Sequence, residues 1–130
     1  METSSKPARR VLTPGPDHPI FIEPNPRRVR ITVGATALAD SRGALTLREA
    51  GCLPVQYIPR QDVSMQMLER SDHQTYCPYK GECSYFSIPS AGERGRNAVW
   101  TYEAPFAAVS TIKDYLAFYP QGVDSITEEP

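Results

Sequence analysis

Residues 28–33 (RVRITV) place an apolar side chain at every second position, with Val29, Ile31 and Val33 separated by polar residues. This alternation is typical of a β-strand with one buried face. Other short segments with strand character follow along the chain, and turn residues separate them. They cover residues 36–41, 45–50, 55–60, 75–81, 83–89, 98–105 and 115–119. Short strands at this spacing predict a protein whose core is built from β-strands.

Two segments favour helical structure instead. Pro105 suits the first turn of a helix, and Phe106, Val109 and Ile112 recur at helical spacing. We therefore expect a short helix over about residues 105–113. Asp62 is a candidate cap for a helical turn over residues 63–70.

The two ends of the chain differ in composition from the segment between them. Prolines at 7, 14, 16, 19, 24 and 26 exclude a regular helix near the N-terminus. Residues 1–18 are interpreted as a proline-rich arm, and residues 20–22 are expected to lie extended on the body of the protein. Residues 19–124 are predicted to form a single β-rich domain, and residues 125–130 an acidic, frayed tail.

Charge and hydropathy exclude several classes of protein. The net charge is −1 with both signs interspersed, so no basic surface for nucleic acid is expected. The chain has neither an apolar run of membrane-spanning length nor an N-terminal secretory signal. We therefore expect a soluble cytoplasmic protein without membrane partners, whose three cysteines are thiols.

Four side chains could in principle bind zinc: Cys52, His73, Cys77 and Cys83. Structural zinc sites usually use cysteine pairs two to four residues apart, and this spacing is absent. We therefore expect neither a bound metal nor a cofactor. Cys77 has a second interpretation, because the cation Lys80 three residues away would lower the pKa of its thiol. A buried thiol acting as a small apolar side chain is the alternative.

Aromatic residues indicate a pocket. Trp100 and Tyr102 are two residues apart and share one face of a strand. Tyrosines in neighbouring strands, with a few charged groups, would line a concave small-molecule site. The alternatives are an aromatic core, and a structural ion pair between Arg60 and Asp62. The predicted ligand-binding residues are Tyr57, Arg60, Tyr79, Lys80, Trp100 and Tyr102.

No phosphate-binding loop accompanies these residues, and the acidic residues needed for a catalytic magnesium site are scattered. Several motifs nevertheless run in a recognisable order. They are ADS at 39–41, YIPRQDV at 57–63, CPYKG at 77–81, WTYEAP at 100–105 and AFY at 117–119. Over residues 18–123 the chain resembles a bacterial domain-of-unknown-function family, number four-two-seven, also described as nucleotidyltransferase-like.

The resemblance implies a small β-tent fold of two antiparallel sheets with one or two short helices and no zinc knuckles. It also implies a ligand site in the open concavity between the sheets. We therefore expect the protein to bind a small anionic or planar molecule, with or without transforming it. Candidate catalytic residues are Cys77, Lys80 and Asp62. One alternative is an interaction module that dimerises through the arm or a sheet edge, and another is a thiol-dependent enzyme that uses Cys77.

Overall fold

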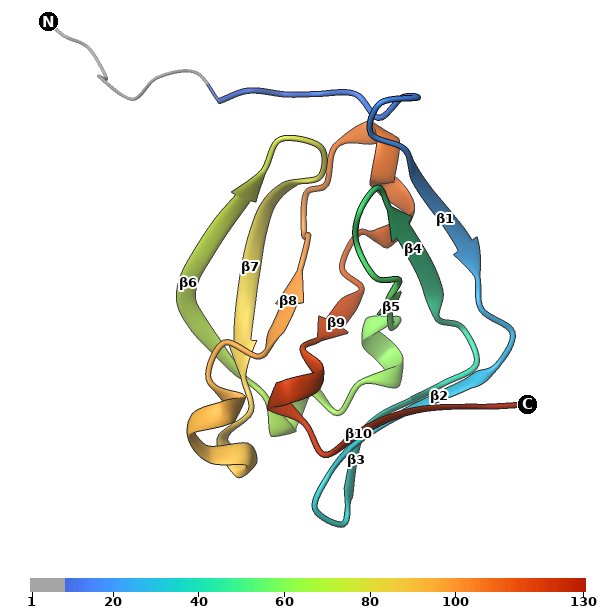
Figure 1. Cartoon of the computed structure of the whole chain (residues 1–130). Coiled ribbons are helices and arrows are strands. Elements are labelled where there is room, and N and C mark those ends of the chain that lie inside the picture. The colour runs from blue at the N-terminus through green and yellow to red at the C-terminus, as the bar shows by residue number, and fades with distance from the viewer. Residues whose placement is uncertain (1–8) are drawn as a thin grey trace, which may run out of the picture.

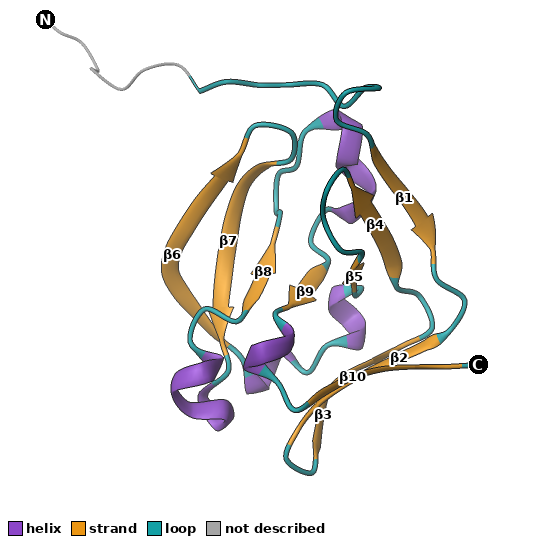
Figure 2. Cartoon of the chain, in the orientation of Figure 1, coloured by secondary structure: helices purple, strands orange, loops and turns teal. Residues whose placement is uncertain are grey.

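The computed structural model describes residues 9–130, so the first eight residues of the predicted arm lie outside the described residues. The described chain is mainly β, as the sequence predicts, with ten strands in antiparallel pairs (Figures 1 and 2). In chain order the strands are β1 (Ile20–Pro24), β2 (Arg28–Val33), β3 (Thr36–Ser41), β4 (Leu45–Glu49), β5 (Val55–Tyr57), β6 (Glu69–Cys77), β7 (Gly81–Ser87), β8 (Val99–Thr101), β9 (Leu116–Phe118) and β10 (Ser125–Glu129).

The strands form three sheets rather than the two implied by the family resemblance. The sheet orders are β1-β4-β5, β10-β2-β3 and β6-β7-β8-β9. Figure 1 shows the four-stranded sheet on one side, the β1-β4-β5 sheet opposite it, and the β10-β2-β3 sheet below them. An isolated backbone bridge joins the first sheet to the last, because Ile58 and Leu116 exchange N–H···O bonds of 2.8 and 2.9 Å.

The helical elements are short 3₁₀ turns: η1 (Arg60–Asp62), η2 (Met65–Met67), η3 (Pro89–Gly95), η4 (Ala107–Ile112) and η5 (Pro120–Gly122). The helix predicted over 105–113 corresponds to η4, which is kinked because Val109 leaves the helical backbone region. The expected cap at Asp62 is wrong. The N-cap of the turn that forms there, η2, is Ser64, and the Asp62 carboxylate accepts a 2.6 Å hydrogen bond from the Ser41 hydroxyl instead.

Two groups of buried side chains form the core. The larger one lies between the β10-β2-β3 sheet and the four-stranded sheet, and its fully buried members include Ile31, Leu38 and Ile88. The smaller one gathers Tyr57 and Tyr102 with side chains of the β1-β4-β5 sheet and the four-stranded sheet. Tyrosine carries a polar hydroxyl, so this second group creates a mixed environment between sheets.

The C-terminal segment is not a frayed tail. Residues 125–129 form β10, which pairs with β2 from the Ser125–Thr32 position to the Glu129–Arg28 position. The side chain of Ile126 packs against the larger core. The segment is ordered because the outer edge of β2 needs backbone partners and Ile126 adds apolar burial.

The described part of the arm lies on its own chain. The N–H of Leu12 donates a 2.9 Å hydrogen bond to the carbonyl of Pro78, and Arg9 forms an ion pair with Glu82. Residues 20–22, expected to be extended, belong to β1 and pair with β4. Within residues 9–130, no helix has the length and apolar character needed to cross a membrane.

Candidate functional site

A cavity of about 310 Å³ lies where the β1-β4-β5 sheet faces the four-stranded sheet. We call it the aromatic pocket and define it by six lining residues: Glu49, Tyr57, Lys80, Cys83, Trp100 and Tyr102. They come from β4, β5, β7, β8, the loop before β7 and the residue after β8. Chain segments far apart in sequence therefore meet around one small volume.

Hydrogen bonding and ring contacts fix the aromatic walls. The indole N–H of Trp100 donates a 3.1 Å hydrogen bond to the Tyr57 hydroxyl, and the two rings meet edge to face. Tyr119 packs against the other side of the indole with ring centroids 4.4 Å apart. Burial raises the pKa of both Tyr57 and Tyr102, so their phenols are neutral near neutral pH.

An ion pair forms the polar end of the pocket. Lys80 donates to Glu49, and only 12% of each side chain is exposed. The ring of His18 lies 2.7 Å from the other Glu49 oxygen and stacks on Tyr79 with a centroid distance of 3.9 Å. Burial alone would raise the pKa of Glu49, but the hydrogen bonds from Lys80 and His18 outweigh burial and hold it below its usual value.

This arrangement determines which chemistry the pocket offers. The Lys80 charge is offset by Glu49, so the pocket presents an adjacent donor and acceptor rather than a free cation. The ammonium also lies 5.9 Å from the centroid of the Tyr102 ring. The Cys83 thiol faces the pocket but is 1% exposed, and burial raises its pKa, which suppresses the reactive thiolate.

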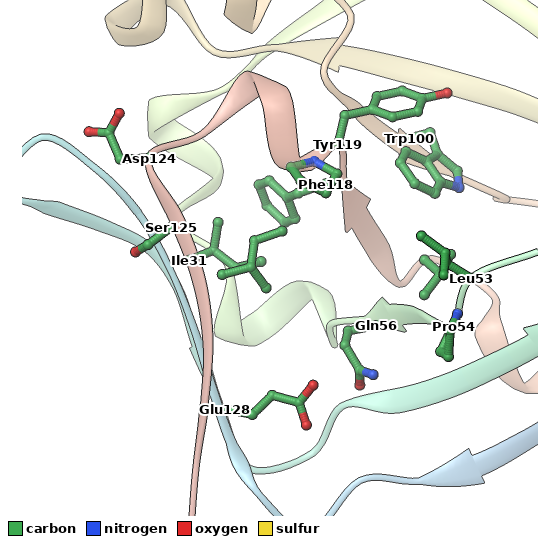
Figure 3. A pocket seen from close by; sticks show the side chains of 13 residues that line it. Ile31, Leu53, Pro54, Gln56, Trp100, Phe118, Tyr119, Asp124, Ser125 and Glu128 are labelled. Atoms are coloured by element: carbon green, nitrogen blue, oxygen red, sulfur yellow. The ribbon is translucent and has the colours of Figure 1, made fainter.

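A larger cavity of about 720 Å³ adjoins the aromatic pocket (Figure 3). We call it the edge cavity. Its walls include Leu53, Val55, Trp100 and Tyr119, which also line the aromatic pocket. Trp100 therefore contributes to both volumes.

Comparison with known proteins places the chain in a family. Residues 21–129 match the model of a family described as "Domain of unknown function (DUF427)". The chain belongs to the DUF427 family. This match confirms the resemblance drawn from the sequence motifs and includes the C-terminal strand β10. A search of curated proteins found no match.

Four of the six ligand-binding residues predicted for this DUF427 chain line the aromatic pocket: Tyr57, Lys80, Trp100 and Tyr102. Arg60 lies elsewhere, where its guanidinium donates to the Glu103 carboxylate at 3.1 Å and to the Asp114 carbonyl at 3.0 Å. Arg60 pairs with Glu103 rather than with Asp62. Tyr79 contacts the pocket indirectly, through its stack on His18.

The cysteines of the DUF427 chain occupy three different environments. Cys52 is exposed, Cys77 is half-buried at the end of β6, and Cys83 is buried. The ring of His73 packs against the ring of Tyr85, with their centroids 4.6 Å apart. Across residues 9–130, no three histidine, cysteine or acidic side chains gather in a way that could hold a metal ion.

Glu49 and His18 were not among the predicted site residues, although the sequence carries one signal for Glu49. Leu45, Leu47 and Glu49 alternate along β4 and therefore share one face of the strand. A carboxylate that continues an inward apolar row needs a buried partner, which here is Lys80. His18 had no comparable signal, because its contact depends on the path of the arm.

Proposed function

We propose that the aromatic pocket binds a small planar molecule. The observation that carries this proposal is the combination of fixed aromatic walls with a mostly buried Lys80–Glu49 pair at one end. A volume of about 310 Å³ is in the range of small-molecule sites, which are mainly apolar with a few placed polar groups.

In this proposal the ring of the ligand packs against Trp100, and its polar edge meets the ion pair. The Lys80 ammonium donates to an acceptor on the ligand, and the Glu49 carboxylate accepts from a donor beside it. A neutral planar molecule is favoured over an anion because the charge of Lys80 is already offset. Tyr57 acts by holding the indole of Trp100 in place.

The two other predicted ligand-binding residues take indirect roles in this proposal. Tyr79 orients His18, and His18 orients Glu49. Arg60 helps to position β8, because its guanidinium donates a 3.2 Å hydrogen bond to the hydroxyl of Thr101, the residue that follows Trp100. A catalytic role for Lys80 or Asp62 and a cytoplasmic location stay predictions.

The experiment uses the only tryptophan in the chain, Trp100, as an intrinsic probe of the pocket. Nucleobases, nicotinamide and indole derivatives are titrated while Trp100 emission is recorded, and hits are checked by thermal unfolding. A ligand at about 100 times its dissociation constant adds about 2.7 kcal/mol of stability. Binding should be lost in Lys80→Met and retained in Lys113→Met, which changes an exposed lysine. Absence of any response across the series would contradict the proposal.

An interaction module is the second candidate, and one observation favours it. Phe21 is 65% exposed on β1, which is an edge strand of its sheet. An exposed aromatic residue on a free edge is a suitable contact for a second copy of the chain. Sedimentation of wild type and Phe21→Ser tests it, since a strictly monomeric wild type would remove this candidate. The thiol enzyme has less support, because Lys80 is engaged by Glu49 rather than free to activate Cys77.

A further inference from the structure

The edge cavity lies where the free edges of the three sheets meet. β5, β9 and β10 are each the outermost strand of a sheet, and residues of all three line this cavity. Figure 3 shows Glu128 and Gln56 near one end of the cavity and Trp100 and Tyr119 near the other. Its volume of about 720 Å³ is enough for a drug-sized molecule.

A fixed polar group stands at one end of the edge cavity. Asn25 is 8% exposed, and its amide nitrogen donates to the Gln56 oxygen at 2.9 Å and to a Glu128 oxygen at 3.1 Å. The hydroxyl of Thr46 donates to the same Gln56 oxygen at 3.0 Å. The buried amide thus orients the carboxylate of Glu128, an exposed side chain, beside the cavity.

The charge of the cavity wall has one sign. Asp124 and Glu128 are the charged side chains that line it, and both are carboxylates. Asp124 is paired with Arg94, whereas Glu128 forms no ion pair within residues 9–130. Arg27 and Arg48 line a neighbouring hollow that Glu128 also lines, and Arg48 is paired with Glu23.

Most of the remaining lining residues are apolar or aromatic, with Leu53, Phe118 and Trp100 among them. An oriented carboxylate without a cation, at one end of a mainly apolar and aromatic cavity, is complementary to an ammonium group on an apolar body.

We propose that the edge cavity binds an organic ammonium ion, with the ammonium group at Glu128 and the apolar body along Leu53, Phe118 and Trp100. This inference goes beyond the proposed function, because its charged group is Glu128 rather than the Lys80–Glu49 pair. Because Trp100 and Tyr119 line both volumes, one ligand can place a ring in the aromatic pocket and an ammonium group in the edge cavity.

The test compares 3-phenylpropylammonium with 3-phenylpropan-1-ol by calorimetric titration of the full chain, with Trp100 emission as a second readout. The two probes share an apolar body and differ in charge. We expect the ammonium to bind about ten times more tightly than the alcohol. Glu128→Gln should remove this preference.

Glu129→Gln is the matched control. Glu129 is the next residue of β10, points to the other face of the strand and lies 3.8 Å from Arg28, so it should keep the tenfold preference. Equal affinity for both probes, no binding of either, a preference that survives Glu128→Gln, or equal losses in both variants would each overturn the proposal. The planar compounds are titrated separately against Lys80→Met, so failure of the aromatic pocket and failure of the edge cavity are distinguishable.

Discussion

Replacing Lys80 with methionine should destabilise the protein and make its stability depend on pH in a new way. Both charged side chains of the Lys80–Glu49 pair are 12% exposed, so the substitution leaves a desolvated carboxylate with only His18 as a partner. Removing one member of a buried pair costs about 3–5 kcal/mol. We expect about 3 kcal/mol, because some exposure and the His18 contact remain.

The pH dependence follows from the direction of the Glu49 shift. In the wild type the folded-state pKa lies below the ordinary 4.5, so Glu49 adds stability above pH 4.5 that is lost as the pH falls through the folded pKa. Without Lys80, burial dominates and raises the folded-state pKa. The charged Glu49 carboxylate then destabilises the folded state at neutral pH, and protonation of the carboxylate removes this destabilisation. The stability difference between the variant and the wild type should therefore shrink in acid.

Urea unfolding followed by Trp100 emission measures this difference at neutral pH and near pH 4. Lys113→Met is the control, since it makes the same substitution at an exposed position. A loss below about 1 kcal/mol at neutral pH would place the pair in the range of surface ion pairs. A loss of the same size at both pH values would refute the assignment of the effect to the Glu49 charge.

Three further predictions concern packing, the C-terminal strand and the thiols. Gly122→Ala should lower the free energy of unfolding by about 1–3 kcal/mol, because the new Cβ would lie 2.4 Å from the Ala98 Cβ. Urea unfolding measures this, and an unchanged urea midpoint would contradict it. Deletion of residues 125–130 removes β10 and should lower the melting temperature, whereas a frayed tail could be removed without effect. Cys52 should react with a thiol reagent in the folded protein, whereas Cys83 should react only on unfolding, because it is buried and burial raises the pKa of its thiol. Peptide mapping of the labelled protein checks this, and labelling of Cys83 in the folded protein would refute it.

Local patterns in the sequence were sufficient to predict much of the fold. The alternation in residues 28–33 gave β2, and the spacing of Trp100 and Tyr102 placed both side chains at the pocket. β10 was missed because its segment has one apolar residue, Ile126, and is held mainly by backbone pairing with β2. A segment stabilised by the free edge of a distant strand carries little signal of its own.

The candidate site shows the same division between local and distant information. Arg60 and Asp62 are two residues apart, which suggested a pair, but each binds a partner far away in the chain. Lys80 was found from its local motif, whereas its partner Glu49 is 31 residues away. Pairing between distant segments depends on how the sheets face each other, and one sequence does not encode this in any short pattern.

The single bridge between Ile58 and Leu116 has a mechanical consequence. Beyond it β5 and β9 run on as separate edges with the edge cavity next to them, and side chains rather than backbone bonds join the two sheets there. We expect the bridge to act as a hinge, so that rotation about it would change the width of the cavity while each sheet keeps its internal ladder, on a timescale of microseconds to milliseconds. A molecule that fills the cavity would hold the hinge at one angle. Slower amide exchange in β5 and β9 would then report occupancy, even for a ligand too weak to change the melting temperature.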